Sequence, residues 1–414
     1  MIFTSLPKGS DGSRRTPCDG PFAVRASGDY LFQSSKTRRG LYALGALTPQ
    51  RTLTHTFDAP GDSLALDGGR VLAPYTLAYQ TWGQLNADRS NAILIFHALS
   101  GDSHVAGTHE DGRTGWWDLM VGPGRAFDTD RYFIICANVL GGCKGSTGPS
   151  STKPATGKPY ATDFPVITIN DMVRSQRPLL RVLGIEKLHA VTGGSMGGML
   201  TLAFTQLYPE MTDRAIVLAS AAANHAQAIA WNKIGRRAIM SDPLWRDGHY
   251  YDSPEGPPKR GLAIARMIGH VTYISEGAMD QKFGRKLQTA EKESYSFDVD
   301  YSVESYLAYQ GSIFHQRFDA NSYLYITRAI DYFDFAAAIH GDLTAAFART
   351  KARFRFFSYD ADWLYSPERN ETMTSAAKAA GREAVHHKIH APLGHDAFLV
   401  QRDPQTDLIR EFLA

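Results

Sequence analysis

One glycine-rich turn constrains the fold of this chain more than any other segment. The sequence Leu188-His-Ala-Val-Thr-Gly-Gly-Ser195-Met-Gly-Gly-Met199 joins an apolar, β-branched run to a stretch that we expect to be helical from Met199 to Leu207. A serine framed as Gly-x-Ser-x-Gly between a strand and a helix lies in a strained turn, which presents its Oγ above a sheet. The turn therefore predicts that Ser195 is a nucleophile; the alternative is a glycine turn with a purely structural role.

From about residue 53, short β-rich runs alternate with helical segments, and several runs are almost continuously apolar. Such runs are expected of strands buried on both faces of a parallel sheet. The predicted strands are Tyr75–Thr81, Ala92–His97, Tyr132–Asn138, Leu188–Thr192, Arg214–Ala219, Phe354–Tyr359 and Ala384–His390. The predicted helices of this part are Ile169–Leu183, Met199–Leu207, Glu371–Ala380 and Asp403–Leu413. Together with the serine turn, the alternation predicts an α/β-hydrolase fold, a doubly wound and mostly parallel sheet.

The alternation stops between residues 221 and 345 and resumes at Arg353. Helices are predicted within this stretch at Ala226–Met240, Leu262–Tyr273, Val303–Phe314 and Ser322–Tyr332. We expect 221–345 to be a helical lid inserted into an α/β core made of 53–220 and 346–414. Ligands of open α/β sheets bind at the carboxyl ends of the strands, so a lid at this position would lie over the nucleophile.

The net charge of +2 is unevenly placed along the 414 residues. Residues 1–52 hold eight Lys/Arg and three Asp/Glu, a balance of +5, and the remainder carries 36 against 39, or −3. We expect 1–52 to be a disordered basic arm, and the rest to have no affinity for nucleic acid. No run reaches the roughly 18 apolar residues of a membrane span. Three cysteines make no disulfide framework, which predicts a reducing, cytoplasmic location.

A serine hydroxyl needs a base, and the base needs an acid that orients it. In this fold the acid follows the serine in the chain and the base comes last. Asp360 and Asp362 both follow the strand Phe354–Tyr359, and we favour Asp362 because Asp360 suits a turn directly after a strand. Of the late histidines, His386, His387 and His390 lie in or at the end of a strand. His395 lies in a loop before the last helix and is the predicted base.

An oxyanion hole requires two backbone N–H donors. Met196, directly after the nucleophile, is the first predicted donor, and Leu99, in the loop after the strand Ala92–His97, is the second. His97 and His104 are less favoured as extra bases, because histidines in such loops are usually structural. Cys143 lies in the loop Gly141-Gly-Cys-Lys-Gly-Ser-Thr-Gly148, where a catalytic thiol is less expected than a small loop residue. The spacing of Cys and His gives no metal signature.

With these residues placed, the chain from about residue 52 onward resembles the homoserine O-acyltransferase family of α/β-hydrolases, in particular its acetyltransferase branch. The resemblance rests on long segments that occur in the same order. They are Ala78-Tyr-Gln-Thr-Trp-Gly83, His97-Ala-Leu-Ser-Gly-Asp102, Gly115-Trp-Trp-Asp118, Asn138-Val-Leu-Gly-Gly-Cys-Lys-Gly-Ser-Thr-Gly-Pro149, Gly193-Gly-Ser-Met-Gly-Gly198, Arg317-Phe-Asp-Ala-Asn-Ser-Tyr323, Ala361-Asp-Trp-Leu364 and Gly394-His-Asp-Ala-Phe398.

The resemblance implies that Ser195, Asp362 and His395 form a catalytic triad, in agreement with the choice made from the residues alone. It also implies that Arg266 and Asp396 bind the amino-acid substrate. From the residues alone, Arg266 is a surface arginine on a lid helix and Asp396 a helix cap. The implied reaction transfers an acetyl group from acetyl-CoA, a co-substrate, to L-homoserine for methionine synthesis, with no bound cofactor. A homodimer formed through the lid is also implied.

Two alternatives accompany this interpretation. Members of the wider family acylate serine or use succinyl-CoA, so a homoserine or serine O-succinyltransferase is the first. The elbow here resembles that of the homoserine branch, since the serine-acylating relatives tend to have Asn before the nucleophile. The second alternative is a serine esterase with the same triad and water as the acceptor. A narrow, water-poor site under a lid favours transfer over hydrolysis.

Overall fold

A computed structural model describes residues 51–288 and 291–414, so most of the basic arm predicted for 1–52 lies outside the described residues. The described part contains an eight-stranded sheet in the order β1-β4-β6-β5-β7-β8-β9-β10, and β2 and β3 form a separate hairpin. The strands are β1 (Leu53–Phe57), β2 (Leu64–Ala65), β3 (Val71–Leu72), β4 (Tyr75–Trp82), β5 (Ala92–Phe96), β6 (Phe133–Ala137), β7 (Ala190–Gly194), β8 (Arg214–Leu218), β9 (Arg353–Tyr359) and β10 (Ala384–Ile389).

The sheet is mostly parallel, as predicted. All pairings from β6 to β10 are parallel, whereas β4 runs antiparallel to both β1 and β6. The central strands of the sheet are buried on both faces, and their side chains alternate between two apolar clusters. This double burial explains the continuous apolar runs in the sequence. In β5, Leu94 and Phe96 enter one cluster, and Ile93 and Ile95 enter the other on the opposite face.

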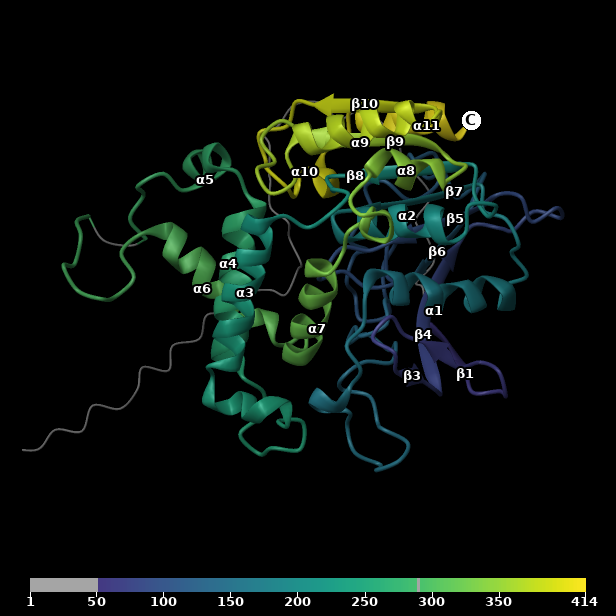
Figure 1. Cartoon of the computed structure of the whole chain (residues 1–414). Coiled ribbons are helices and arrows are strands. Elements are labelled where there is room, and N and C mark those ends of the chain that lie inside the picture. The colour runs from purple at the N-terminus through teal and green to yellow at the C-terminus, as the bar shows by residue number, and fades with distance from the viewer. Residues whose placement is uncertain (1–50, 289–290) are drawn as a thin grey trace, which may run out of the picture. The chain divides into compact units, whose positions relative to one another are not determined.

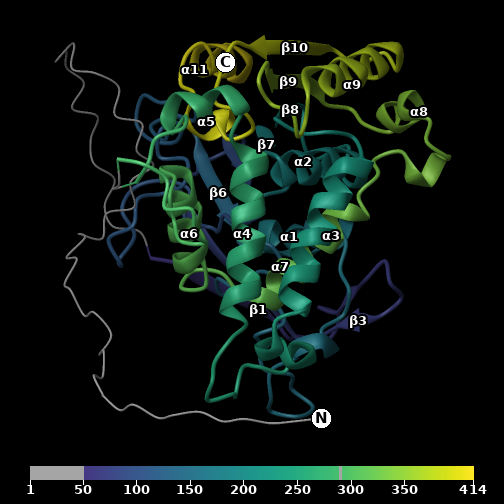
Figure 2. The same ribbon diagram turned by 90° about the vertical axis from the view of Figure 1, so that its left-hand side faces the viewer.

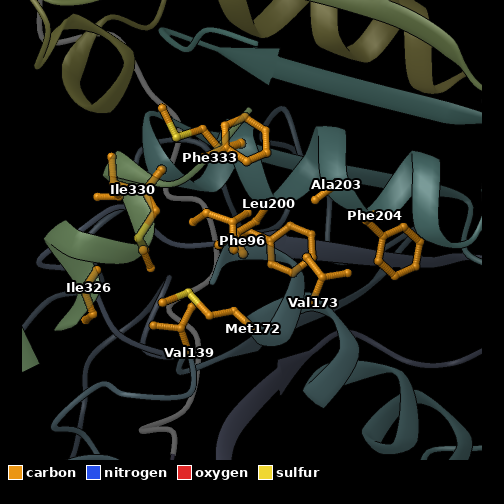
Figure 3. Packing of buried hydrophobic residues seen from close by; sticks show 14 of the residues in the cluster. Phe96, Val139, Met172, Val173, Leu200, Ala203, Phe204, Ile326, Ile330 and Phe333 are labelled. Carbon is orange, nitrogen blue, oxygen red and sulfur yellow. The ribbon is translucent and has the colours of Figure 1, made fainter. Parts of the chain in front are cut away.

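Helices cover both faces of this sheet (Figure 1). Those of the core are α1 (Ile169–Val182), α2 (Met196–Leu207), α9 (Pro367–Ala379), α10 (Ala397–Val400) and α11 (Gln405–Leu413). Figure 3 shows the cluster on one face, where Phe96 of β5 packs with Met172 and Val173 of α1 and with Leu200 of α2. On the opposite face Ile409 and the rest of the apolar stripe of α11 join the second cluster.

The chain between β8 and β9 is helical, and Figures 1 and 2 show most of these helices grouped beside the sheet, whereas the last of them packs against α9. They are α3 (Ala226–Met240), α4 (Lys259–Tyr273), α5 (Glu276–Lys282), α6 (Ser302–Phe314), α7 (Ala320–Asp331) and α8 (Leu343–Ala348). Figure 2 shows α4 between α3 and α6, and α4 packs against both of them. Ile326 and Ile330 of α7 extend the core cluster of Figure 3, so this insertion is packed onto the α/β core.

Some predicted boundaries differ from the structure. Helix α2 begins at Met196, three residues earlier than predicted, because Ser195 itself is the residue before the helix and the glycines that follow are helical. Strand β7 extends to Gly194, since both of its neighbours pair with its glycines: Gly193 lies opposite Phe96 of β5, and Gly194 opposite Leu218 of β8. The last predicted helix, Asp403–Leu413, is α11, which begins two residues later at Gln405, and the short helix α10 before it was not predicted. None of the described helices is long and apolar enough to cross a membrane.

Candidate active site

Ser195 lies at the sharp turn between β7 and α2. Its backbone has φ 57° and ψ −122°, a conformation that costs a residue other than glycine about 1–3 kcal/mol. Hydrogen bonds on both sides hold it there. Its N–H donates to the Leu218 carbonyl at 2.9 Å, and its carbonyl accepts from the Ser220 hydroxyl at 2.8 Å. The neighbouring strand β8 and the loop after it therefore hold the nucleophile in its strained turn.

The glycines of this turn are required by close contacts between backbones. A Cβ on Gly197 would lie 2.2 Å from the Phe96 carbonyl oxygen, and a Cβ on Gly193 would lie 2.5 Å from the backbone of Gly197. A Cβ on Gly198 would lie 2.5 Å from the Cβ of Ser220. Strand β7, helix α2 and the ends of the two neighbouring strands thus approach one another too closely for any side chain.

The structure brings Ser195, His395 and Asp362 together from three separate loops. The His395 Nε2 lies 2.9 Å from Ser195 Oγ, and His395 Nδ1 lies 2.9 Å from Asp362 Oδ2. The other carboxylate oxygen of Asp362 accepts from the N–H groups of Leu364 and Tyr365, both at 2.9 Å. Asp362 is 2% exposed and His395 3% exposed. A buried carboxylate that is fully hydrogen-bonded can orient an imidazole toward a serine hydroxyl.

The pKa of His395 is raised above its ordinary value. Burial acts in the opposite direction, because it disfavours the charged imidazolium. The charge and hydrogen bond of Asp362, together with the charge of Asp396, outweigh burial. An imidazole whose cation is stabilised in this way is suited to accepting a proton from a serine hydroxyl.

The competing acid and histidines have other partners. Asp360 forms an ion pair with the exposed His390 and accepts from the Ala391 N–H at 2.9 Å, so it holds the end of β10. The His386 ring contacts the Ser358 hydroxyl at 2.7 Å, and His387 stacks on a phenylalanine of β9. Of the late histidines, only His395 contacts Ser195 in the described part of the chain.

The two predicted oxyanion donors lie on different segments, Met196 on α2 and Leu99 on the loop after β5. Met196 is the first residue of α2, where an N–H has no partner within the helix. Leu99 follows Ala98, whose carbonyl accepts from His97 Nδ1 at 2.8 Å and from the Gly101 N–H at 3.0 Å. Because a trans peptide directs its N–H opposite to its C=O, these bonds also fix the direction of the Leu99 N–H.

Neither His97 nor His104 contacts the triad, and both have structural partners. The Val139 N–H donates to His97 Nε2 at 3.0 Å, so the imidazole joins the loop after β5 to the loop after β6. Burial lowers the pKa of His97 and of His104. The ring nitrogens of His104 contact the Gln80 side chain at 2.9 Å and the Arg113 carbonyl at 3.2 Å.

Comparison with known proteins places the chain in a family. Residues 91–331 match the model of the alpha/beta hydrolase fold family. The chain is 52% identical over 374 residues to a homoserine O-acetyltransferase of Caulobacter vibrioides, a match that covers 90% of this chain and 97% of that protein. It belongs to the homoserine O-acyltransferase family. A homoserine O-succinyltransferase of Acidithiobacillus ferrooxidans is 51% identical over 360 residues, with 86% of this chain and 92% of that protein covered.

A solved structure agrees with this membership of the homoserine O-acyltransferase family. The crystal structure of homoserine O-acetyltransferase from Bacillus anthracis matches with a TM-score of 0.82 and 30% sequence identity. The match covers 89% of this chain and 98% of that chain, so it includes the helices between β8 and β9 as well as the sheet.

The resemblance to this acyltransferase family also linked Arg266 to substrate binding, and the structure shows what surrounds it. Arg266 is buried on α4, not exposed as the sequence alone suggested, and is 9% exposed. Its Nη1 lies 3.5 Å from the hydroxyl of Ser100, which follows Leu99, and its guanidinium lies over the Phe314 ring at 4.7 Å. Helix α4 therefore carries a buried cation to the loop that holds a predicted oxyanion donor.

Asp396 directly follows the base His395 and is partly buried. It precedes α10, but its side chain makes no capping hydrogen bond, so the helix-cap interpretation of this residue is wrong. Burial raises the pKa of Asp396, while the charges of His395 and Arg266 act in the opposite direction. Arg266 and Asp396 thus influence each other, yet no ion pair joins them within the described residues.

Aromatic rings enclose the imidazole of His395. The ring centroids of Tyr273, Tyr365 and Phe398 lie 5.9, 5.3 and 5.7 Å from that of His395. Tyr273 ends α4, and its carbonyl accepts from the Asp396 N–H at 3.1 Å. Helix α4 therefore supplies one wall around the base, and the loop after β9 and helix α10 supply the others.

Sequence reasoning gave no role to Arg317, although it begins one of the motifs that carried the resemblance. Its Nη1 donates to the Ser100 carbonyl at 3.3 Å, so Arg266 and Arg317 converge on one residue of the loop after β5. The guanidinium of Arg317 also lies over the Phe314 ring, at 5.2 Å. Its place in that motif was the only available signal, because a contact between residues 217 positions apart has no local pattern.

Cys143 does not contact the triad. Burial raises the pKa of its thiol to about 11, which keeps it protonated and unreactive at neutral pH. Cys136 and Cys143 are both free thiols. Among the described residues, no group of three or more His, Cys, Asp or Glu side chains is placed to hold a metal ion.

Proposed function

We propose that this protein is a homoserine O-acetyltransferase that acts through an acetylated Ser195. The observation that carries the proposal is the hydrogen-bonded series from Ser195 to His395 to Asp362, beside Asp396, whose pKa responds to the charges of both His395 and Arg266. A triad alone supports acyl transfer to any acceptor. The two opposite charges beside it support an acceptor that is a small amino acid.

In the first half-reaction, His395 Nε2 accepts the proton of Ser195 Oγ while Oγ attacks the thioester carbonyl of acetyl-CoA. Asp362 stabilises the imidazolium that forms. The N–H groups of Leu99 and Met196 stabilise the negative charge on the former carbonyl oxygen. The C–S bond then breaks, the CoA thiolate leaves with the proton from His395, and the acetyl group stays on Ser195 as an ester.

In the second half-reaction, homoserine takes the place of CoA. Arg266 offers a planar, two-pronged donor to the α-carboxylate, and Asp396 offers an acceptor to the α-ammonium. Asp396 adjoins His395, so an ammonium held there would place the side-chain hydroxyl beside the imidazole. His395 accepts the hydroxyl proton and the oxygen attacks the acetyl ester. The bond from the acetyl carbon to Ser195 Oγ then breaks, His395 returns the proton to Oγ, and O-acetylhomoserine, a precursor for methionine, is released.

The helices between β8 and β9 act as the lid in this proposal. Arg266 and Tyr273, which come from α4, would line the acceptor site and limit access of water to the acetyl ester. Exclusion of water is what separates a transferase from an esterase with the same triad.

The decisive experiment measures CoA release from acetyl-CoA by the purified full-length protein, with and without L-homoserine. We expect release to depend on homoserine, and O-acetylhomoserine to form in equal amount. Equal release without homoserine would establish the esterase alternative. Replacing acetyl-CoA by succinyl-CoA, and homoserine by L-serine, tests the succinyltransferase alternatives, and a higher kcat/KM for succinyl-CoA would reverse the donor assignment.

The two half-reactions test the acceptor residues separately. Arg266→Ala and Asp396→Asn should spare formation of the acetyl-enzyme, measured by intact mass spectrometry after mixing with acetyl-CoA alone. Each should weaken transfer to homoserine by about 2–5 kcal/mol, because each leaves a buried charge without its partner. Slower acetylation with unchanged saturation by homoserine would instead place these residues on the donor side.

We also propose that the protein forms a homodimer through the lid. Four large apolar side chains on its two central helices are exposed, namely Ile234 and Met240 of α3 (49% and 45%) and Ile264 and Val271 of α4 (48% and 42%). Helices α3 and α4 lie side by side, as Figure 2 shows, so these side chains belong to neighbouring elements of one bundle. A second copy of this chain would cover such a face, because clustered exposed apolar side chains mark contact surfaces.

A further inference from the structure

A cavity of about 360 Å³ lies where the lid meets the loop after β6. Its lining includes Cys143 and Lys144 from that loop, Tyr251 from the segment before α4, and His315, Arg317 and Asp319 from the turn between α6 and α7. None of these residues belongs to the triad or to the acceptor site. The cavity therefore offers space for a ligand group that the two half-reactions have not yet placed.

The basic side chains of the cavity outnumber the acidic ones. Lys144 and Arg317 are cationic, and Asp319 is the single acid of the lining. Asp319 is already occupied: it accepts from the hydroxyls of Tyr250 at 2.5 Å and Tyr251 at 3.1 Å, and from the Ser322 N–H at 2.8 Å. Lys144, by contrast, forms no ion pair with any described residue. An anionic group would satisfy it.

Arg317 connects this cavity to the nucleophile. It lines the cavity, and its Nη1 donates to the Ser100 carbonyl at 3.3 Å. Ser100 is the residue after Leu99, and its hydroxyl contacts Arg266 of the acceptor site. The loop that carries Lys144 is joined to the same region, since the Val139 N–H is bonded to His97. Arg317 thus contacts both the cavity and the loop that carries the predicted oxyanion donor Leu99.

We propose that this cavity binds the phosphorylated nucleotide end of the acyl-CoA donor, with Lys144 and Arg317 as the phosphate contacts. The inference rests on the proposed function, because it assumes a CoA thioester as donor. A donor of this kind has a reactive thioester at one end and several phosphate groups at the other. The phosphates require cations outside the water-poor acyl site, and Lys144 and Arg317 supply them in this cavity.

The test compares two donors in the Lys144→Glu protein. Acetyl-CoA carries the nucleotide, and S-acetyl-N-acetylcysteamine has the same thioester without it. We expect kcat/KM for acetyl-CoA to fall at least about ten-fold more than kcat/KM for the short donor, the size of one lost charge-assisted contact. The matched control is Lys158→Glu, an exposed lysine further along the same connection that does not line the cavity. This control should keep the wild-type kcat/KM for both acetyl-CoA and the short donor.

A direct measurement accompanies the kinetics. Isothermal titration with CoA itself should show a Kd at least about ten-fold higher for Lys144→Glu than for the wild type and the Lys158→Glu control. Equal losses with both donors, or an unchanged Kd for CoA, would overturn the assignment of the cavity. A wild-type protein with no preference for acetyl-CoA over the short donor would instead contradict the proposed CoA donor, so the two failures are distinguishable.

Discussion

At the scale of single residues, the strain at Ser195 and its two-sided hydrogen bonding have a direct consequence for mutagenesis. Ser195→Ala removes one oxygen and keeps the backbone bonds to Leu218 and Ser220, so the fold should persist. We expect turnover of acetyl-CoA with homoserine to fall by several powers of ten, as for other triad serines. The exposed Ser241→Ala, at the end of α3, is the control. Near-normal turnover by a folded Ser195→Ala protein would reject Ser195 as the nucleophile.

The two aspartates after β9 offer a matched pair. Asp362→Asn places an amide next to His395 Nδ1, where it cannot hold the same tautomer, and should lower kcat by about 10⁴-fold. Asp360→Asn removes only the contacts at the end of β10 and should cost less than about 1 kcal/mol of stability with little effect on kcat. Steady-state kinetics of both variants show which aspartate is the catalytic acid. The reverse order of effects would make Asp360 the catalytic acid.

The raised pKa of His395 sets the pH dependence of the acylation of Ser195. The imidazole must be neutral to accept the proton of Ser195, so acylation should fall as the pH drops through a pKa above the ordinary 6.5. Asp396→Asn removes a negative charge that stabilises the imidazolium. The pKa of His395 should therefore fall, and the acid limb should move to lower pH. The pH profile of the acylation rate with p-nitrophenyl acetate measures this limb in both proteins. An unmoved limb, or a shift to higher pH, would contradict the prediction.

At the scale of secondary-structure elements, the turn between β7 and α2 depends on the absence of side chains. Gly197→Ala would place a Cβ 2.2 Å from a backbone oxygen that cannot move without distorting β5. We expect a loss of about 3 kcal/mol or more of folding free energy, the upper part of the range for overpacking. The control is Gly277→Ala in α5, where a Cβ would meet nothing within 4 Å. It should gain up to about 1 kcal/mol, since alanine favours helix. Thermal denaturation of both variants tests the contrast, and equal melting temperatures would refute it.

The elements that sequence reasoning found are those with a strong apolar period. The central strands were predicted within one or two residues, because each is buried on both faces and bounded by turn residues. Strand β1 was missed, since it is an edge strand with one buried residue, Phe57, among five. Helix α5 was missed for the same reason: Ala278 is its only buried residue. Short elements with so little burial carry no pattern that distinguishes them from loops.

The residues of the candidate site also differ in how far the sequence alone could predict them. Ser195, Asp362 and His395 follow strands that are themselves recognisable, so chain order and loop position were enough to predict them. Arg266 needed the resemblance, because a lid helix gives no sign from its own sequence of which arginine faces inward. The contact of Arg317 with Ser100 joins the end of α6 to the loop after β5, and only the folded structure brings these segments together.

At the scale of the whole molecule, the exposed apolar face of the lid predicts an association of two copies. Ile234→Glu combined with Ile264→Glu should convert a dimer into a monomer, because an interface that buries two adjacent charges without partners is strongly disfavoured. Size-exclusion chromatography with light scattering measures the mass. The control is Val166→Glu, which is equally exposed at 49% but lies outside the lid. A monomeric wild-type protein, or a double variant that stays dimeric, would exclude this surface as the interface.

The position of the lid in the sheet order has one more consequence. Strands β8 and β9 are parallel neighbours, so the chain must in any case return from the carboxyl edge of the sheet to the amino edge between Leu218 and Arg353. The preceding crossover, from β7 to β8, makes this return with α2 alone. The lid is the same obligatory connection, enlarged. Its two ends are therefore fixed by strand pairing whatever lies between them, and one catalytic sheet can acquire a new acceptor preference by exchange of this single connection, with the register of its strands unchanged.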